Sequence, residues 1–268
     1  MQHPGLQFLQ TLSADSIDTL IKKLRMMVRT FEAFKFPAPT HRGIIAVRSL
    51  GATIISLSAE VLDAVEKGRI FVAGSLCSQI IEADIQLHWL DKHYETNSAD
   101  YMDFGYVEQI GILRVHPERK DAVLQMLKDH NCQRFFSKNR KDDDMPNPKN
   151  YVKNWYGDTI RNISKDCFDD IWNEIKDIPG VLEYYDGSDP NYENYQVFCG
   201  FKHFSPYCVR KCFATEGSFA EDTPDDTKKV VLILAIQSLV SLGTILEKHG
   251  DPIMHMQALE TTGLEHSS

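Results

Sequence analysis

The pattern of apolar positions along the chain predicts a protein made almost entirely of helices. Over residues 14–36 apolar side chains recur every three or four residues, which is the spacing of one helical face. Sustained alternation of apolar and polar residues, the mark of a half-buried strand, is absent from the sequence. We expect an all-α fold, a multi-helix bundle, with helices at 14–36, 41–66, 70–93, two within 98–130, one resuming near Tyr151, and others at 168–177, 191–202, 205–214 and 227–248.

Turn and capping residues divide this pattern. Ser13 or Asp15 is expected to cap the first helix, and His116-Pro117 to separate the two helices of 98–130. Residues near 131–150 contain charged side chains and prolines, which predict a mobile loop. We expect a single helical domain over 1–262, whose halves 1–130 and 151–250 pack together, followed by a disordered tail at 263–268. The segment 41–66 is apolar nearly all round and rich in small residues, which predicts a central helix.

The segment from Val230 to Leu246 is uncharged, so membrane insertion has to be considered. It is shorter than the roughly twenty apolar residues of a spanning helix, and it contains Gln237 and Ser238. A buried core helix is therefore favoured. The start of the chain lacks a basic stretch followed by an apolar run, and the six cysteines form no C-x-x-C pair. We expect a cytoplasmic protein with reduced thiols and no membrane partner.

Composition and charge exclude some functions. The chain is 43% hydrophobic and 25% charged, an ordinary globular balance, and its formal net charge is −9. This charge disfavours a protein that coats nucleic acid non-specifically, and we expect no binding to double-stranded DNA. Basic residues nevertheless gather between 133 and 153, either as a solvated face or as the lip of a phosphate-binding groove, with Arg134, Lys138, Arg140, Lys141 and Trp155 as candidate binding residues.

Three residues near the late helix are candidates for catalysis. Tyr195, Cys199 and His203 are spaced four residues apart, so they share one helical face. A histidine can act as general acid or base near neutral pH, and a cysteine one turn away can be its thiol partner. The alternative is a packed tyrosine and cysteine beside a histidine that ends the helix.

Glu82 and three residues of the same helix are further candidates. Glu82 interrupts an apolar helix, where a carboxylate is costly unless it is paired, and the candidate partners are Arg48 and Arg161. A structural ion pair and a functional carboxylate both remain open. A weaker hypothesis is a metal site formed by Asp84, His88 and Asp91, which share one helical face. Carboxylates and imidazole are ligands that a divalent ion binds. The alternative is a solvated surface with a His–Asp pair. Nucleotide-binding and hydrolase motifs are absent, and no cofactor is predicted.

Three segments carry a resemblance to a known family. Leu76–Leu90 resembles the early helix of an uncharacterised bacterial family of helical proteins, a domain of unknown function. Trp155–Arg161 resembles the W-x-G-x-x-x-R segment of that family, and Tyr184–Pro206 its late Y-x-x-x-S-x-x-x-H stretch, in which Tyr195 and His203 match. The resemblance implies a helical bundle distantly similar to HEPN domains, which often dimerise and in many cases cleave RNA in toxin or antiphage systems.

The chain also departs from that pattern. HEPN nucleases use R-x4–6-H, and none of the ten histidines has an arginine at this spacing. This chain has Ser78 in place of the arginine of the early helix and Cys199 in place of the serine of the late stretch. Gln196 occupies the position before His203 at which an arginine would assist phosphate chemistry. Each change removes a cation or a hydroxyl that phosphate chemistry would use, so ribonuclease activity is in doubt.

Three hypotheses follow. The first is a HEPN-like module that binds RNA or a partner protein in bacterial stress or phage defence, with Tyr195, His203, Arg161 and Glu82 at one cleft. The second is a non-enzymatic interaction protein that acts as a homo-oligomer, such as a homodimer. The third is a metal-dependent hydrolase on the Asp84 face. The sequence does not decide whether the chain is an enzyme.

Overall fold

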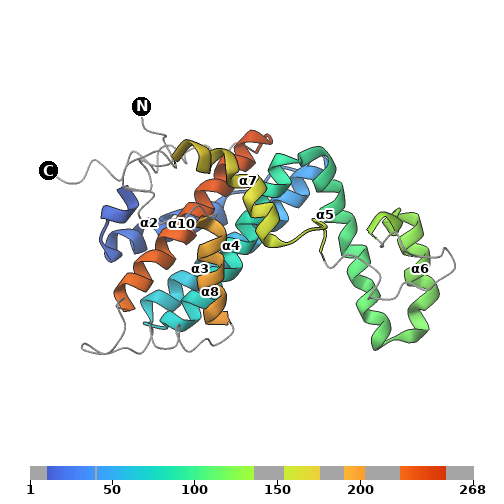
Figure 1. Ribbon diagram of the computed structural model, residues 1–268, viewed down its shortest axis with the longest axis horizontal. Helices are drawn as coiled ribbons and strands as arrows, with labels where there is room; N and C mark the ends of the chain where they lie inside the picture. Colours follow the sequence, from blue (N-terminus) through green and yellow to red (C-terminus); the bar gives the residue numbers. More distant parts are fainter. Residues whose placement is uncertain (1–10, 40, 136–153, 176–189, 203–223, 252–268) are drawn as a thin grey trace.

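The described part of the chain is all-α, as predicted. The computed structural model describes residues 11–39, 41–135, 154–175, 190–202 and 224–251, and contains no strand among them. The expected helix at 205–214 and the tail at 263–268 lie outside these residues. The α-helices are packed as a bundle from which one end extends (Figure 1): α2 (Ile17–Ala33), α3 (Arg42–Glu66), α4 (Ile70–Lys92), α5 (Tyr94–Glu108), α6 (Lys120–Asp129), α7 (Ile160–Ile175), α8 (Pro190–Lys202) and α10 (Pro224–Lys248).

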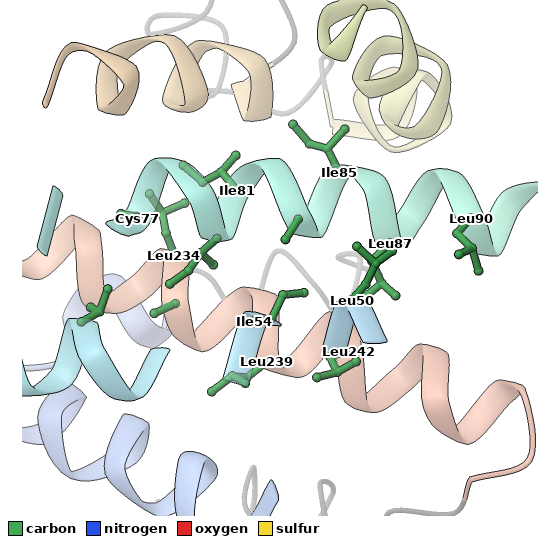
Figure 2. Close-up of a cluster of buried hydrophobic side chains, with 14 of the residues drawn as sticks. Leu50, Ile54, Cys77, Ile81, Ile85, Leu87, Leu90, Leu234, Leu239 and Leu242 are labelled. Atoms are coloured by element: carbon green, nitrogen blue, oxygen red, sulfur yellow. The ribbon is translucent and has the colours of Figure 1, made fainter. Parts of the chain in front are cut away.

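Helix α4 lies at the centre of the bundle. It contacts α3, α5, α7, α8 and α10, whereas α2 packs on the far side against α3 and α10. Figure 2 shows the reason in its side chains: Ile81 and Ile85 point toward α7 and α8, and Cys77 and Leu87 point the other way, toward α3 and α10. The predicted central helix, α3, contacts α2, α4, α5 and α10. Like α4, on which Val72 and Gln79 are exposed, it leaves one face partly open. Helices α3 and α4 therefore share the centre of the bundle.

Small residues allow the close packing around α4. A methyl group at Gly74 would lie 2.6 Å from the ring of Phe201 on α8, and one at Gly51 would lie 2.6 Å from Leu242 on α10. Phe201 is almost fully buried and packs against Phe198 and Phe71, with ring centroids 5.5 and 5.8 Å away. Because Gly74 has no side chain, the Phe201 ring fills the space beside it, and α8 can pack closely on α4.

Helix boundaries differ from the sequence expectation where capping decides them. Ser16, rather than Ser13 or Asp15, caps α2: its hydroxyl accepts from the Thr19 amide at 3.2 Å. Asp15 instead pairs with Lys23 at 2.7 Å. Helix α7 begins at Ile160 rather than near 168, because Thr159 accepts from the Asn162 amide and can start the helix there.

Three helices are long and apolar enough to cross a membrane: Arg42–Glu66, Ile70–Lys92 and Asp225–Lys248. In the folded chain 44%, 56% and 61% of their most apolar windows are buried. The uncharged segment of α10 contributes Val231, Leu239 and Leu246 to the core, where they pack among α2, α3 and α4.

An arm, residues 109–135, extends from the bundle beyond α5 (Figure 1). It consists of the 3₁₀ turns η1 (Gln109–Arg114), η2 (Pro117–Arg119) and η3 (Cys132–Phe135) together with α6, which pack mainly on α5 and on one another. Its orientation is set at the base by Asp103, which accepts from Arg42 of α3 at 2.6 Å and from Arg134 at 2.8 Å. The His116-Pro117 join appears as expected, as the step from η1 into η2 and α6.

The packing at Gly74 predicts opposite effects for two chemically identical substitutions. Gly74→Ala should destabilise the protein by about 1–3 kcal/mol, because the new methyl group overlaps the buried Phe201 ring. Gly105→Ala, on α5 with nothing within 4 Å, should stabilise it by about 0.5–1 kcal/mol through helix propensity. Urea unfolding of both variants measures the difference, and equal shifts of the two midpoints would contradict this packing.

Candidate functional site

The central feature of the site is a contact between Glu82 and Tyr195. Glu82 lies on α4, and Tyr195 lies on α8, 113 residues later, with its hydroxyl donating to Glu82 Oε2 at 3.5 Å. Both side chains are half-buried. Antiparallel packing of α8 on α4 brings them together, since Phe201 meets Gly74 at one end and Tyr195 meets Glu82 further along.

A turn before α7 adds aromatic side chains to the same place. Gly157 has φ +67°, a backbone conformation that glycine adopts without strain, and it lets the chain turn directly after Trp155 and Tyr156. Trp155 is buried, and its indole N–H donates to Gln86 of α4 at 2.9 Å. Gln86 lies one helical turn after Glu82, so the turn is attached to α4 beside the carboxylate.

The electrostatics of the cluster keep both tyrosines protonated. Burial, followed by the Glu82 carboxylate, raises the pKa of Tyr156 to about 12, against a smaller lowering by Asn154. Burial also raises the pKa of Tyr195, and a hydrogen bond with Cys199 and the charge of Glu82 raise it further. At neutral pH the cluster therefore presents phenol hydroxyls as hydrogen-bond donors next to one carboxylate, with the free, half-buried Cys199 thiol beside Tyr195.

The structure separates one of the two candidate arginines from Glu82. Arg48 does not pair with Glu82: its guanidinium binds Asp251 through two hydrogen bonds of 2.7 and 2.6 Å. Arg161 is exposed in the first turn of α7. Arg134 pairs with Asp100 and Asp103 at the base of the arm, so its charge is already partly neutralised. His203, Lys138, Arg140 and Lys141 lie outside the described residues.

The metal-site candidates do not gather into one site. Asp84 faces Ser238 of α10 rather than solvent: burial raises its pKa, while His88 and a hydrogen bond with Ser238 lower it. Its side chain is only 16% exposed and lies 3.9 Å from His88 Nε2, so the expected His–Asp pair is present but does not form a solvated face. Asp91 instead binds His249 at 2.7 Å and Lys248 at 2.9 Å. Within the described residues no three histidine, cysteine or acidic side chains are placed to hold a metal ion.

A second polar cluster, at the end of α10, has no signal in the sequence. His249 stacks on Tyr94 with ring centroids 3.7 Å apart, and it binds Asp91. The Tyr94 hydroxyl is 3.1 Å from His41 Nδ1, an atom that also accepts from the Ile44 amide. Because His41 Nδ1 is an acceptor there, the tyrosine hydroxyl is the donor. These contacts fasten the end of α10 to α3 and α4, and they involve residues too far apart for any local pattern to reveal.

Comparison of the chain with protein-family models, with curated proteins and with solved structures finds no match. The candidate site therefore has to be interpreted from its own geometry.

The raised pKa of Tyr156 predicts a specific dependence of stability on alkaline pH. Folding raises this pKa from 10.0 to about 12, so the folded state retains the proton more strongly than the unfolded state between these values. Its stabilising contribution is complete below pH 10 and is lost as the pH rises through the folded pKa.

Tyr156→Phe should therefore lose less stability than the wild type between about pH 9 and about pH 11.5, as measured by urea midpoints. Glu82→Gln serves as the comparison, because it keeps the tyrosine but removes the charge that raises its pKa. Identical pH profiles for the wild type and Tyr156→Phe would contradict the assigned environment.

Proposed function

We propose that this chain is a HEPN-like helical module of the bacterial cytoplasm that binds single-stranded RNA in a stress or phage-defence setting, without cleaving it. The observation that carries the proposal is the meeting of three separate segments. Glu82 comes from the early helix, Tyr156 from the W-x-G turn and Tyr195 from the late stretch. These are the three segments on which the family resemblance rests, and all three contribute groups around one carboxylate.

The chemistry of the cluster suits RNA better than a bare phosphate. A carboxylate repels phosphate but accepts hydrogen bonds from a ribose 2′-hydroxyl or from a base amino group. Protonated tyrosines donate to phosphate or base oxygens, and their rings can stack on unpaired bases. Arg161, exposed in the first turn of α7, supplies a cation near a helix N-terminus, where anions are stabilised.

Binding without cleavage follows from what the sequence lacks. Cleavage by the HEPN pattern needs an arginine and a histidine at the scissile phosphate, and none of the ten histidines has an arginine at the required spacing. Tyr195 shares a hydrogen bond with Cys199, and its raised pKa keeps the phenol protonated, so Tyr195 is not a base near neutral pH.

RNA binding tests the proposal directly. Glu82→Gln and Tyr195→Phe should each weaken binding of a labelled single-stranded RNA about tenfold, measured by fluorescence anisotropy, because each removes one hydrogen-bonding group. The matched control is Glu60→Gln, an exposed carboxylate on α3 that should leave the affinity unchanged. Circular dichroism shows whether each variant keeps its fold.

Two results would contradict the proposal. The first is a wild-type protein that does not bind RNA at all. The second is RNA degradation by the wild type that His203→Ala abolishes, since the protein would then be a nuclease rather than a binding module.

A second candidate function, assembly as a homo-oligomer, is favoured by one face of α3. The exposed stripe on this face consists of small side chains, and its hydroxyls donate to backbone carbonyls of their own helix: Ser49 to Ile45 at 2.8 Å and Thr53 to Ser49 at 3.3 Å. Because these hydroxyls already have acceptors, the stripe can face another helix at close range without losing hydrogen bonds.

If α3 is an oligomer interface, Ala52→Arg should convert a dimer into a monomer in multi-angle light scattering, because the new charge would be buried between the two helices. Ala122→Arg, at an exposed position on α6, is the control and should leave the dimer intact. A wild-type protein that is strictly monomeric at high concentration would exclude this candidate.

A further inference from the structure

The apolar core of the bundle continues into the arm. Phe104 and Phe135 pack edge to face at 5.5 Å, and the remaining buried side chains come from the end of α5 and from the arm: Val107, Ile110, Val123, Leu127 and Cys132. The ion pairs of Arg42 and Arg134 with Asp103 then hold this unit in one orientation relative to α3. The arm is a small folded unit presented away from the bundle (Figure 1).

The arm is basic in an acidic protein. Residues 109–135 contain five basic and three acidic residues, whereas the whole chain has a net charge of −9. Exposed Arg119, Lys120 and Lys128 form no ion pair with the part of the chain that the structure describes. Lys120 and Lys128 are two helical turns apart, so they lie on one face of α6. The three acidic residues of the arm are exposed as well: Glu118 lies 3.1 Å from His116, Asp129 accepts from the Gln125 amide at 2.8 Å, and Asp121 follows Lys120.

Aromatic rings lie at the surface of the same arm. His130, at the end of α6, stacks on Tyr106 with ring centroids 3.7 Å apart and an interplanar angle of 13°. Both rings are half-buried, and the stack is therefore partly open to solvent. Val115, at the step between η1 and η2, is 74% exposed, the largest exposed fraction of the described bulky apolar side chains.

Exposed cations beside stacked aromatic rings are the combination that binds single-stranded nucleic acid, because the cations neutralise phosphates and the rings extend the base stack. We infer that the arm binds single-stranded RNA, with Arg119, Lys120 and Lys128 on the phosphates and the Tyr106–His130 stack against a base. This inference rests on the proposed function and deepens it: the arm supplies affinity for the RNA backbone, and the Glu82 cluster contacts the sugar or base.

The charge contribution is tested by the salt dependence of binding to polyuridylate. The triple variant Arg119→Gln/Lys120→Gln/Lys128→Gln removes three phosphate contacts. The negative slope of the logarithm of the association constant against the logarithm of the salt concentration should become shallower by about 2, and binding at low salt should weaken at least about tenfold. The control triple variant, Lys22→Gln/Arg29→Gln/Lys35→Gln, makes the same change in net charge at exposed positions on and just after α2, and should leave the slope unchanged. All six residues are on the surface, so both variants should keep the wild-type melting temperature.

The stacking contribution is tested by His130→Ala, which should weaken polyuridylate binding about tenfold while leaving the salt slope unchanged. Polyglutamate distinguishes RNA from an acidic protein partner. If the wild type binds polyglutamate as tightly as polyuridylate and His130→Ala affects neither, the arm docks an acidic protein and the RNA inference is wrong.

The outcomes separate the two proposals. A wild type that binds RNA with a slope unaffected by the arm triple variant overturns the arm inference and leaves the proposed function standing. A wild type that binds no RNA overturns both.

Discussion

The rest of the structure depends on one constraint, which is that α4 presents buried apolar side chains to five other helices and has to be covered by them. Helices α3, α5, α7, α8 and α10 cover most of its surface, while Val72 and Gln79 stay exposed. Each polar group on such a helix costs a few kcal/mol unless it finds a partner. Four polar residues of α4 form cross-helix contacts: Glu82 with Tyr195, Gln86 with Trp155, Asp84 with Ser238, and Asp91 with His249. The buried Oδ1 of Asp84 has no hydrogen-bond partner among the described residues.

These contacts connect stability to the candidate site. The Trp155–Gln86 hydrogen bond and the seat of Phe201 on Gly74 are packing features, yet they also decide that Tyr156 and Tyr195 lie against the same carboxylate. Burial then raises the pKa of both phenols and keeps them as donors. The arm is joined to the bundle by continuous apolar packing and by an ion-pair network at its base.

Much of the fold could be predicted from the sequence, because helix periodicity is a local signal. The segments expected at 41–66, 70–93 and 191–202 match α3, α4 and α8 to within a residue or so. The expectation failed where one hydrogen bond decides the boundary, as at Ser16. Glu82 was expected to pair with Arg48 or Arg161, and Arg48 instead binds Asp251 at the opposite end of the chain.

By itself, the sequence determined the helical class, the approximate extent of most helices and the identity of the residues that would need partners. These properties depend on neighbours within a few turns. Only the tertiary structure decided which helices surround α4, which face of α8 meets it, and which partners its polar side chains find. Those outcomes depend on the order and rotation of helices around a common core, and they join residues as far apart as Glu82 and Tyr195 or Arg48 and Asp251.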